Sequence, residues 1–213
     1  MTGKIKLVHS GGNAVSIAVP TSNPSSSEVE FKLPQADGTS GQALVTDASG
    51  NLSFAGTGKL LQVVSTTRTD TFSENVATGS LSADALTVNI TPSNANNKIF
   101  LTAHVSMGLN NDNEVNWVFY KAGSLLTGAA GTAAGNRKPR TSAGDVRWTG
   151  THNTTGGQYL DTAGGTSQIT YSVRLGHSAN GTKTVYLNRS HTDDNYAYDI
   201  RTQSTLTVME VAA

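Results

Sequence analysis

The sequence predicts an all-β protein, with a small N-terminal β module followed by an antiparallel β-sandwich of jelly-roll-like type. Apolar and polar residues alternate along many short segments, as they do in strands with one buried face. Clusters of Gly, Asn, Asp and Ser separate these segments. No stretch has the 3.6-residue apolar period of an amphipathic helix. Many short strands divided by turn signals are typical of β-sandwiches.

The composition excludes several classes of protein. The 213 residues have a formal net charge of zero, which argues against a dedicated nucleic-acid binder, because that function needs a basic face. The chain has no cysteine, so it has no disulfides and no thiolate nucleophile or metal site. It has no apolar run long enough to span a membrane. The start of the chain is too poor in apolar residues for a signal peptide, so we expect no export by that route.

The first strands expected are short and weak: Lys4–Val8, Ala14–Val19 and Glu28–Leu33. Each has apolar residues on one face only, so three of them cannot enclose a core. We therefore expect this part to form a trimer or to dock onto a larger body.

The stretch Phe31–Gly56 divides the chain. It holds two turn clusters, Pro34–Gly38 and Asp47–Asn51, beside short apolar stretches. The domains expected are a module with its linker at residues 1–57 and a sandwich at residues 58–213. A module of this size is marginal on its own, whereas the body can bury enough surface to fold alone.

The body contains longer strands. Those expected are Leu60–Thr67, Ala85–Ile90, Lys98–Met107, Glu114–Lys121, Ser167–Leu175, Thr182–Leu187 and Ser204–Val211. Lys98–Met107 has the clearest alternation, and the polar loop after it predicts an antiparallel hairpin with Glu114–Lys121.

Two Gly-rich segments are expected to be loops. Gly123–Gly144 is low in complexity, and its glycines are unfavourable for a helix, so we expect a long surface loop. Thr151–Gly165 is expected to be a Gly/Thr-rich connection, and Arg147–Thr149 a short strand before it.

The candidate surface-binding residues are Arg137, Lys138, Arg140, Trp148 and Tyr159. The three cations form the only dense basic run and could bind an anionic polysaccharide or an acidic patch on a neighbouring subunit. The alternative is a solvated loop tip. The two aromatic residues could stack on sugar rings, or could anchor loops as half-buried side chains.

No motif for catalysis, a metal or a cofactor is present, so we expect no enzyme activity, no cofactor and no metal. Asn110–Glu114 is rich in oxygen ligands for Ca²⁺ but lacks the spaced EF-hand pattern, and an Asx-rich turn is the alternative. Asp193 or Asp194 could serve a glycosidase only with a second carboxyl across a cleft.

Several segments resemble recurrent parts of structural proteins of tailed bacteriophages, especially marine and cyanobacterial phages. These segments are LPQADGTSGQALVTDASGNLSFAGTG (Leu33–Gly58), KLLQVVSTTRTDTFS (Lys59–Ser73), TPSNANNKIFL (Thr91–Leu101), VYLNRS (Val185–Ser190), STLTVMEVAA (Ser204–Ala213) and the opening MTGKIKLVHSGGNAVSIAVP.

The resemblance implies a homotrimeric, fibre-like appendage on the surface of the virion. Its N-terminal module would attach to other virion proteins of the capsid or tail, and its sandwich would face outward for host-surface attachment, with a cell-surface glycan as one target. The alternative is a capsid decoration (cement) protein that stabilises the shell.

Overall fold

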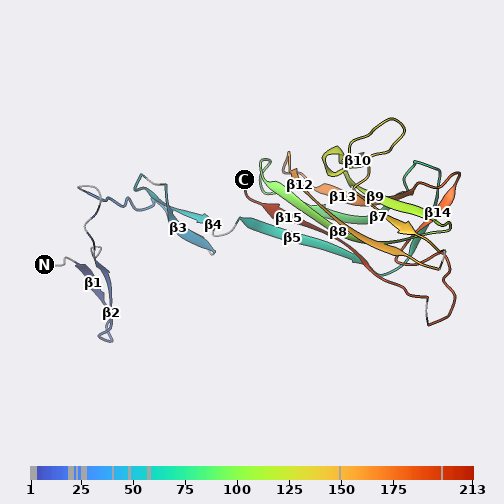
Figure 1. Ribbon diagram of the computed structural model, residues 1–213. Helices are drawn as coiled ribbons and strands as arrows, with labels where there is room; N and C mark the ends of the chain where they lie inside the picture. Colours follow the sequence, from blue (N-terminus) through green and yellow to red (C-terminus); the bar gives the residue numbers. More distant parts are fainter. Residues whose placement is uncertain are drawn as a thin grey trace. The chain divides into compact units, whose positions relative to one another are not determined.

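The computed structural model describes residues 4–18, 22, 24, 28–39, 41–47, 49–56, 59–148, 150–197 and 199–213. Their regular structure consists of β-strands and one short 3-10 turn, η1 (Thr127–Ala129), so the all-β prediction is confirmed (Figure 1). None of the described residues form a helix of the length and apolarity that crossing a membrane requires. The chain divides into two compact units, Met1–Thr57 and Gly58–Ala213.

The second unit is a sandwich of two antiparallel sheets (Figure 1). The six-stranded sheet contains β5 (Leu60–Arg68), β6 (Phe72–Val76), β8 (Lys98–Leu109), β12 (Asn153–Thr162), β14 (Lys183–Leu187) and β15 (Ser204–Val211). The five-stranded sheet contains β7 (Asp84–Ile90), β9 (Asn113–Lys121), β10 (Ser124–Leu125), β11 (Ser142–Val146) and β13 (Ile169–His177). Both sheets contribute to one hydrophobic core, so the predicted sandwich is confirmed.

The chain passes from one sheet to the other after β6, β7, β8, β11, β12 and β13. Such repeated crossing is a feature of jelly-roll-like sandwiches. The predicted hairpin between β8 and β9 is wrong, because β8 pairs with β12, β14 and β15, whereas β9 pairs with β10, β11 and β13. Alternation identifies the inward face of a strand but not the strand it pairs with.

In the six-stranded sheet, one edge of β8 is paired by two successive strands in place of a single long one. β14 and β15 lie along the same edge of β8, with Leu187 opposite Met107 and Thr205 opposite His104. The chain leaves this edge at Asn188 and returns to it at Ser204. β6 and β5 pair with β14 and β15 in the same succession.

The core contains the side chains that alternation places on the inward faces. All five predicted inward residues of β8 are buried, as are their counterparts on β13 and β15; they are Ile99, Leu101, Ala103, Val105, Met107, Ile169, Tyr171, Val173, Leu175, Leu206 and Val208. Trp117 and Phe119 meet edge to face with ring centroids 4.9 Å apart. The Trp117 indole N–H donates to Thr155 Oγ1 at 2.8 Å and so connects the two sheets.

The predicted loops contain strands that the sequence pattern did not reveal. Thr151–Gly165 is mostly the ten-residue strand β12, and β10 and the first residues of β11 lie within Gly123–Gly144. Arg147 and Trp148 lie outside any strand, and Thr149 lies outside the described residues. β12 alternates in burial, but Gly157 faces inward where a Cβ would lie 2.7 Å from Trp117 Cη2. A glycine is therefore required at a position where alternation would predict an apolar side chain.

Glu210 connects the end of β15 to the turn between β7 and β8. Its buried carboxylate accepts hydrogen bonds from Asn97 Nδ2 at 2.6 Å, Gln62 Nε2 at 2.5 Å, and Ser93 N and Oγ at 2.7 and 2.8 Å. Burial alone would raise the pKa of Glu210, but these hydrogen bonds outweigh it and lower the pKa from 4.5 to about 2. The ionised carboxylate therefore stabilises the folded state.

We expect the free energy of unfolding to fall as the pH drops from about 4.5 towards about 2, because the folded pKa of Glu210 lies below its unfolded value. Glu210→Gln should make the free energy of unfolding nearly independent of pH in this range. It should also lower stability at neutral pH by about 1–3 kcal/mol, because the amide NH2 of glutamine would face groups that are themselves hydrogen-bond donors. Urea unfolding of both proteins across this pH range measures the effect, with exposed Asp112→Asn as the control. A variant that keeps the wild-type slope would contradict this role.

The first unit consists of two hairpins, β1 (Lys4–Val8) with β2 (Ala14–Ala18) and β3 (Gln42–Thr46) with β4 (Leu52–Gly56). The strand predictions for β1 and β2 are confirmed as far as Ala18, and Val19 lies outside the described residues.

The prediction of a strand at Glu28–Leu33 is wrong. This segment makes one isolated parallel bridge, between Lys32 and Asn51. Lys32 N donates to Gly50 O, and Leu52 N donates to Lys32 O, each at 2.8 Å. Since the segment makes no longer ladder with the described residues, its alternating pattern does not produce a strand.

Candidate functional site

The basic loop between β9 and β11 is attached to the outer face of the five-stranded sheet by Arg140. Arg140 Nε donates to Asn116 Oδ1 at 2.6 Å, and its Nη2 donates to Gly79 O at 3.1 Å. Burial lowers the pKa of Arg140, against the opposing influence of Tyr120 and Glu114. The guanidinium therefore holds the loop in place in addition to contributing charge.

Arg137 and Lys138 lie beside Arg140 in an open groove of about 420 Å³. Other lining residues include Thr78, Asn116, Asn136 and Ser178, which are polar and uncharged, and the carboxylate residue Glu114. Arg137 and Lys138 are exposed. Within the described part of the chain, neither of these two side chains has a salt bridge. The structure thus brings together the three cations of the predicted set.

Trp148 and Tyr159, the two predicted aromatic residues, lie elsewhere. Trp148 is 73% exposed in the turn after β11. Tyr159 packs against the core, and its ring lies so close to Gly128 that a Cβ there would overlap it. Neither residue lines the basic groove. Tyr159 holds η1 against β12, whereas Trp148 presents a free aromatic surface.

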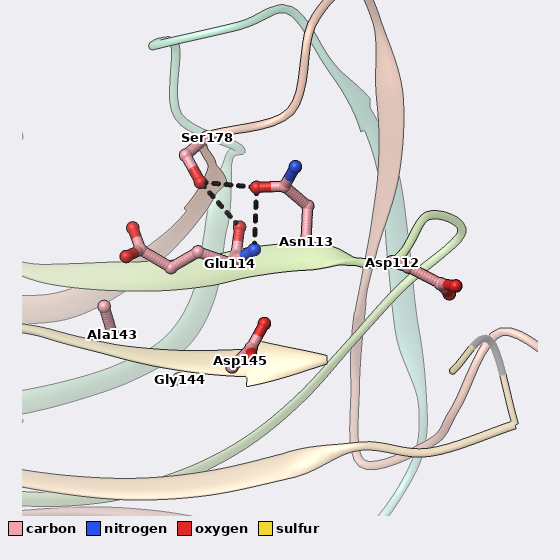
Figure 2. Close-up of a pocket in the computed structure, with 7 residues that line it drawn as sticks. All are labelled: Asp112, Asn113, Glu114, Ala143, Gly144, Asp145 and Ser178. Atoms are coloured by element: carbon pink, nitrogen blue, oxygen red, sulfur yellow. Dashed lines mark hydrogen bonds between the residues drawn. The ribbon is translucent and has the colours of Figure 1, made fainter. Parts of the chain in front are cut away.

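A second open groove, shown in Figure 2, adjoins the first and shares Glu114 and Ser178 with it. Asn113 Oδ1 accepts hydrogen bonds from Ser178 Oγ at 2.8 Å and from Glu114 N at 2.9 Å. The carboxylates of Asp112 and Glu114 point in opposite directions in Figure 2. The Asx-rich turn is therefore the better interpretation of this segment. No group of three or more His, Cys, Asp or Glu residues able to hold a metal occurs among the described residues.

Asp193 is paired with two arginines. Its Oδ2 lies 2.7 Å from Arg201 Nη2 and 3.2 Å from Arg189 Nη1. The hydrogen bond from Arg201, aided by the charges of Arg189 and Arg201, lowers the pKa of Asp193 despite the opposing effect of burial. This carboxylate fixes the excursion between β14 and β15 and is not in the protonated state that a general acid requires.

Among residues 5–14, 17, 22, 24, 28–39, 41–47 and 49–56 of the first unit, no side chain is buried. The extent of this exposed apolar surface was not fully evident from the sequence. Its exposed large apolar residues are Ile5, Leu7, Val8, Ile17, Val29, Phe31, Leu33, Leu44, Val45 and Phe54. The Phe54 ring covers Gly38, but the residue remains 39% exposed. Exposed apolar groups of this size are typical of surfaces that take part in interactions.

No family model matches the sequence. No curated protein matches it either. Solved structures that resemble the chain include two strains of infectious bursal disease virus, Gx (16% identity, TM-score 0.36) and Gt (16%, 0.35), and the VP2 subviral particle of that virus (13%, 0.35). The alignments cover 80%, 95% and 80% of this chain, but only 42%, 48% and 42% of those chains. This chain therefore spans less than half the length of the structures it resembles.

Proposed function

We propose that the chain is a non-enzymatic structural protein of a bacteriophage virion, located on the particle surface as a fibre-like homotrimeric appendage. The observation that carries this proposal is the contrast between the two units. The sandwich has a continuous core, whereas no described side chain of the first unit is buried. A unit that cannot bury its own apolar residues acquires a core from other chains, either identical copies or neighbouring virion proteins.

The resemblance of the sequence segments to tailed-phage structural proteins supports the same proposal. In this account the first unit joins the copies and attaches them to capsid or tail proteins. The sandwich is exposed for host-surface attachment, and the basic groove of Arg137, Lys138 and Arg140 is its binding site for an anionic cell-surface glycan.

The glycan site is tested by reversing its exposed charges. The double variant Arg137→Glu/Lys138→Glu should bind host cells or a purified anionic polysaccharide about tenfold more weakly at low salt, because the attraction is electrostatic. Stability should stay within about 0.5 kcal/mol of wild type, since both side chains are exposed. Arg140 is left intact because it holds the loop.

The matched control is Lys59→Glu/Arg147→Glu, which changes the net charge equally at two other exposed positions. If the control variant weakens binding as much as the loop variant does, the effect comes from net charge and not from the basic groove. Wild-type protein that does not bind any host surface would contradict the attachment role, and a purely shell-stabilising protein would then be favoured.

A further inference from the structure

The outer face of the six-stranded sheet has an apolar row across four neighbouring strands. Val63 on β5 lies opposite Met209 on β15, Met209 lies opposite Phe100 on β8, and Phe100 lies opposite Leu160 on β12. Adjacent residues on these strands point into the core, so these four point away from it. The four strands are side by side in Figure 1.

This apolar row, defined as Val63, Met209, Phe100 and Leu160, is open to solvent in a single chain. Val63 is 52% exposed and Leu160 53% exposed, while the two central side chains are half-buried. An antiparallel sheet with one solvated face normally has polar residues on that face. A contiguous row of four apolar residues departs from this pattern and indicates a surface that is covered in the working protein.

The chemistry of the face indicates what covers it. The row on one side of it contains Ser65, Thr207, Thr102 and Gln158, again in register and again without charge. The row on the other side contains one charge, on exposed Lys98, whose Nζ donates to Thr162 Oγ1 at 2.8 Å. An anionic polysaccharide or an acidic protein patch would find no charge to pair with in the apolar row or in the row of Ser65 and Gln158. Three copies of these neutral rows that converge on a three-fold axis meet neither like-charge repulsion nor an unpaired charge, so the two rows fit a contact among identical copies.

The position of β5 in the chain supports the same occupant. Leu60 and Leu61, at the start of β5, are both exposed and follow the first unit closely in sequence. Copies joined through the first unit would hold the starts of their β5 strands near one another, and the apolar row begins there.

We infer that the apolar row is a contact between copies of this chain. The sandwiches then associate with one another, in addition to the association of the N-terminal modules with one another. The inference rests on the homotrimer in the proposed function and adds to it a defined surface of the sandwich. The sandwiches would then form a fixed cluster rather than separate lobes on a common stem.

The absence of cysteine allows a direct test on the full-length protein. Single variants Val63→Cys and Leu160→Cys place a thiol at each end of the apolar row. Thr87→Cys is the matched control, because Thr87 is an exposed strand residue of the five-stranded sheet. If copies cover the apolar row, maleimide should label positions 63 and 160 about tenfold more slowly than position 87. Protection of these two positions in a monomer would instead assign the cover to the chain's own first unit. The three rates should become equal in denaturant.

Sedimentation of the same samples separates the possible failures. A trimer in which all three thiols react at the same rate would overturn the inference and leave the homotrimer intact. A monomer would overturn both. Slow labelling at both 63 and 160 in a trimer supports the inference. Because the two positions lie at opposite ends of the apolar row, similar rates at both exclude a local effect of one substitution.

Discussion

A protein that begins at residue 58 is expected to remain folded but to lose its ability to join the virion. The sandwich retains its whole core, because every residue of the main hydrophobic cluster lies within Gly58–Ala213. What is removed is the first unit, with the exposed apolar side chains of its described residues, which we propose as the attachment surface. Incorporation into particles should therefore fall to background.

Two measurements on the truncated protein check this expectation. Urea unfolding should give a cooperative transition with a free energy within about 1 kcal/mol of that of the sandwich in the full chain. Particles assembled with the truncated protein should lack it on a stained gel, whereas the full-length protein is present. Loss of cooperative folding would show that the first unit contributes to the core, and normal incorporation would place the attachment surface on the sandwich.

Replacement of Asn188 by alanine is expected to cause the largest loss of stability of any single polar substitution proposed for this chain. Asn188 is fully buried where β14 ends; its Nδ2 donates to Arg68 O and Asp70 O, each at 2.9 Å. Its Oδ1 accepts the Ser204 hydroxyl at 2.6 Å, and Ser204 Oγ in turn accepts Ser106 N at 2.9 Å. This one side chain thus connects the end of β14 to the start of β15, and also to the segment between β5 and β6.

Alanine removes all three hydrogen bonds and must also adopt a φ of 62°, which asparagine tolerates better than other non-glycine residues. Together these effects should cost about 3–5 kcal/mol in the free energy of unfolding. Asn188→Gly, which relieves only the backbone strain, should recover about 1 kcal/mol of that loss. Exposed Asn136→Ala is the control and should change stability by less than about 0.5 kcal/mol. Equal stability of Asn188→Ala and the control would contradict the proposed role of this side chain.

The strands with clear alternation were predictable because burial of one face leaves a direct pattern in the sequence. In β8 the inward positions from Ile99 to Met107 are apolar and buried, and β13 and β15 keep this alternation in their central parts, with buried polar residues at His177, Ser204 and Glu210 near their ends. β12 was not predictable in this way, because Gly157 makes room for the Trp117 ring and so takes the place of an apolar residue. The pairing of β8 with β15 rather than β9 depends on contacts distant in sequence, which no local pattern contains.

The candidate sites were likewise predictable only where they depend on residues close together in the sequence. The basic run was visible in the sequence, but the anchoring role of Arg140 depends on Asn116 and Gly79, which come from distant elements. The apolar row could not be found from the sequence, because it exists only in the register of four strands. The one-faced strands of the first unit predicted that it would not enclose a core, and no side chain is buried among residues 5–14, 17, 22, 24, 28–39, 41–47 and 49–56.

A map of the virion at moderate resolution, with this chain located by a specific antibody or by difference from particles that lack it, tests the central claim most directly. We expect density that projects from the particle, with the sandwiches of three copies at its outer end and the N-terminal modules at its attachment point. Density that lies flat across the junctions of capsid subunits would contradict the appendage role and would favour a decoration protein that stabilises the shell.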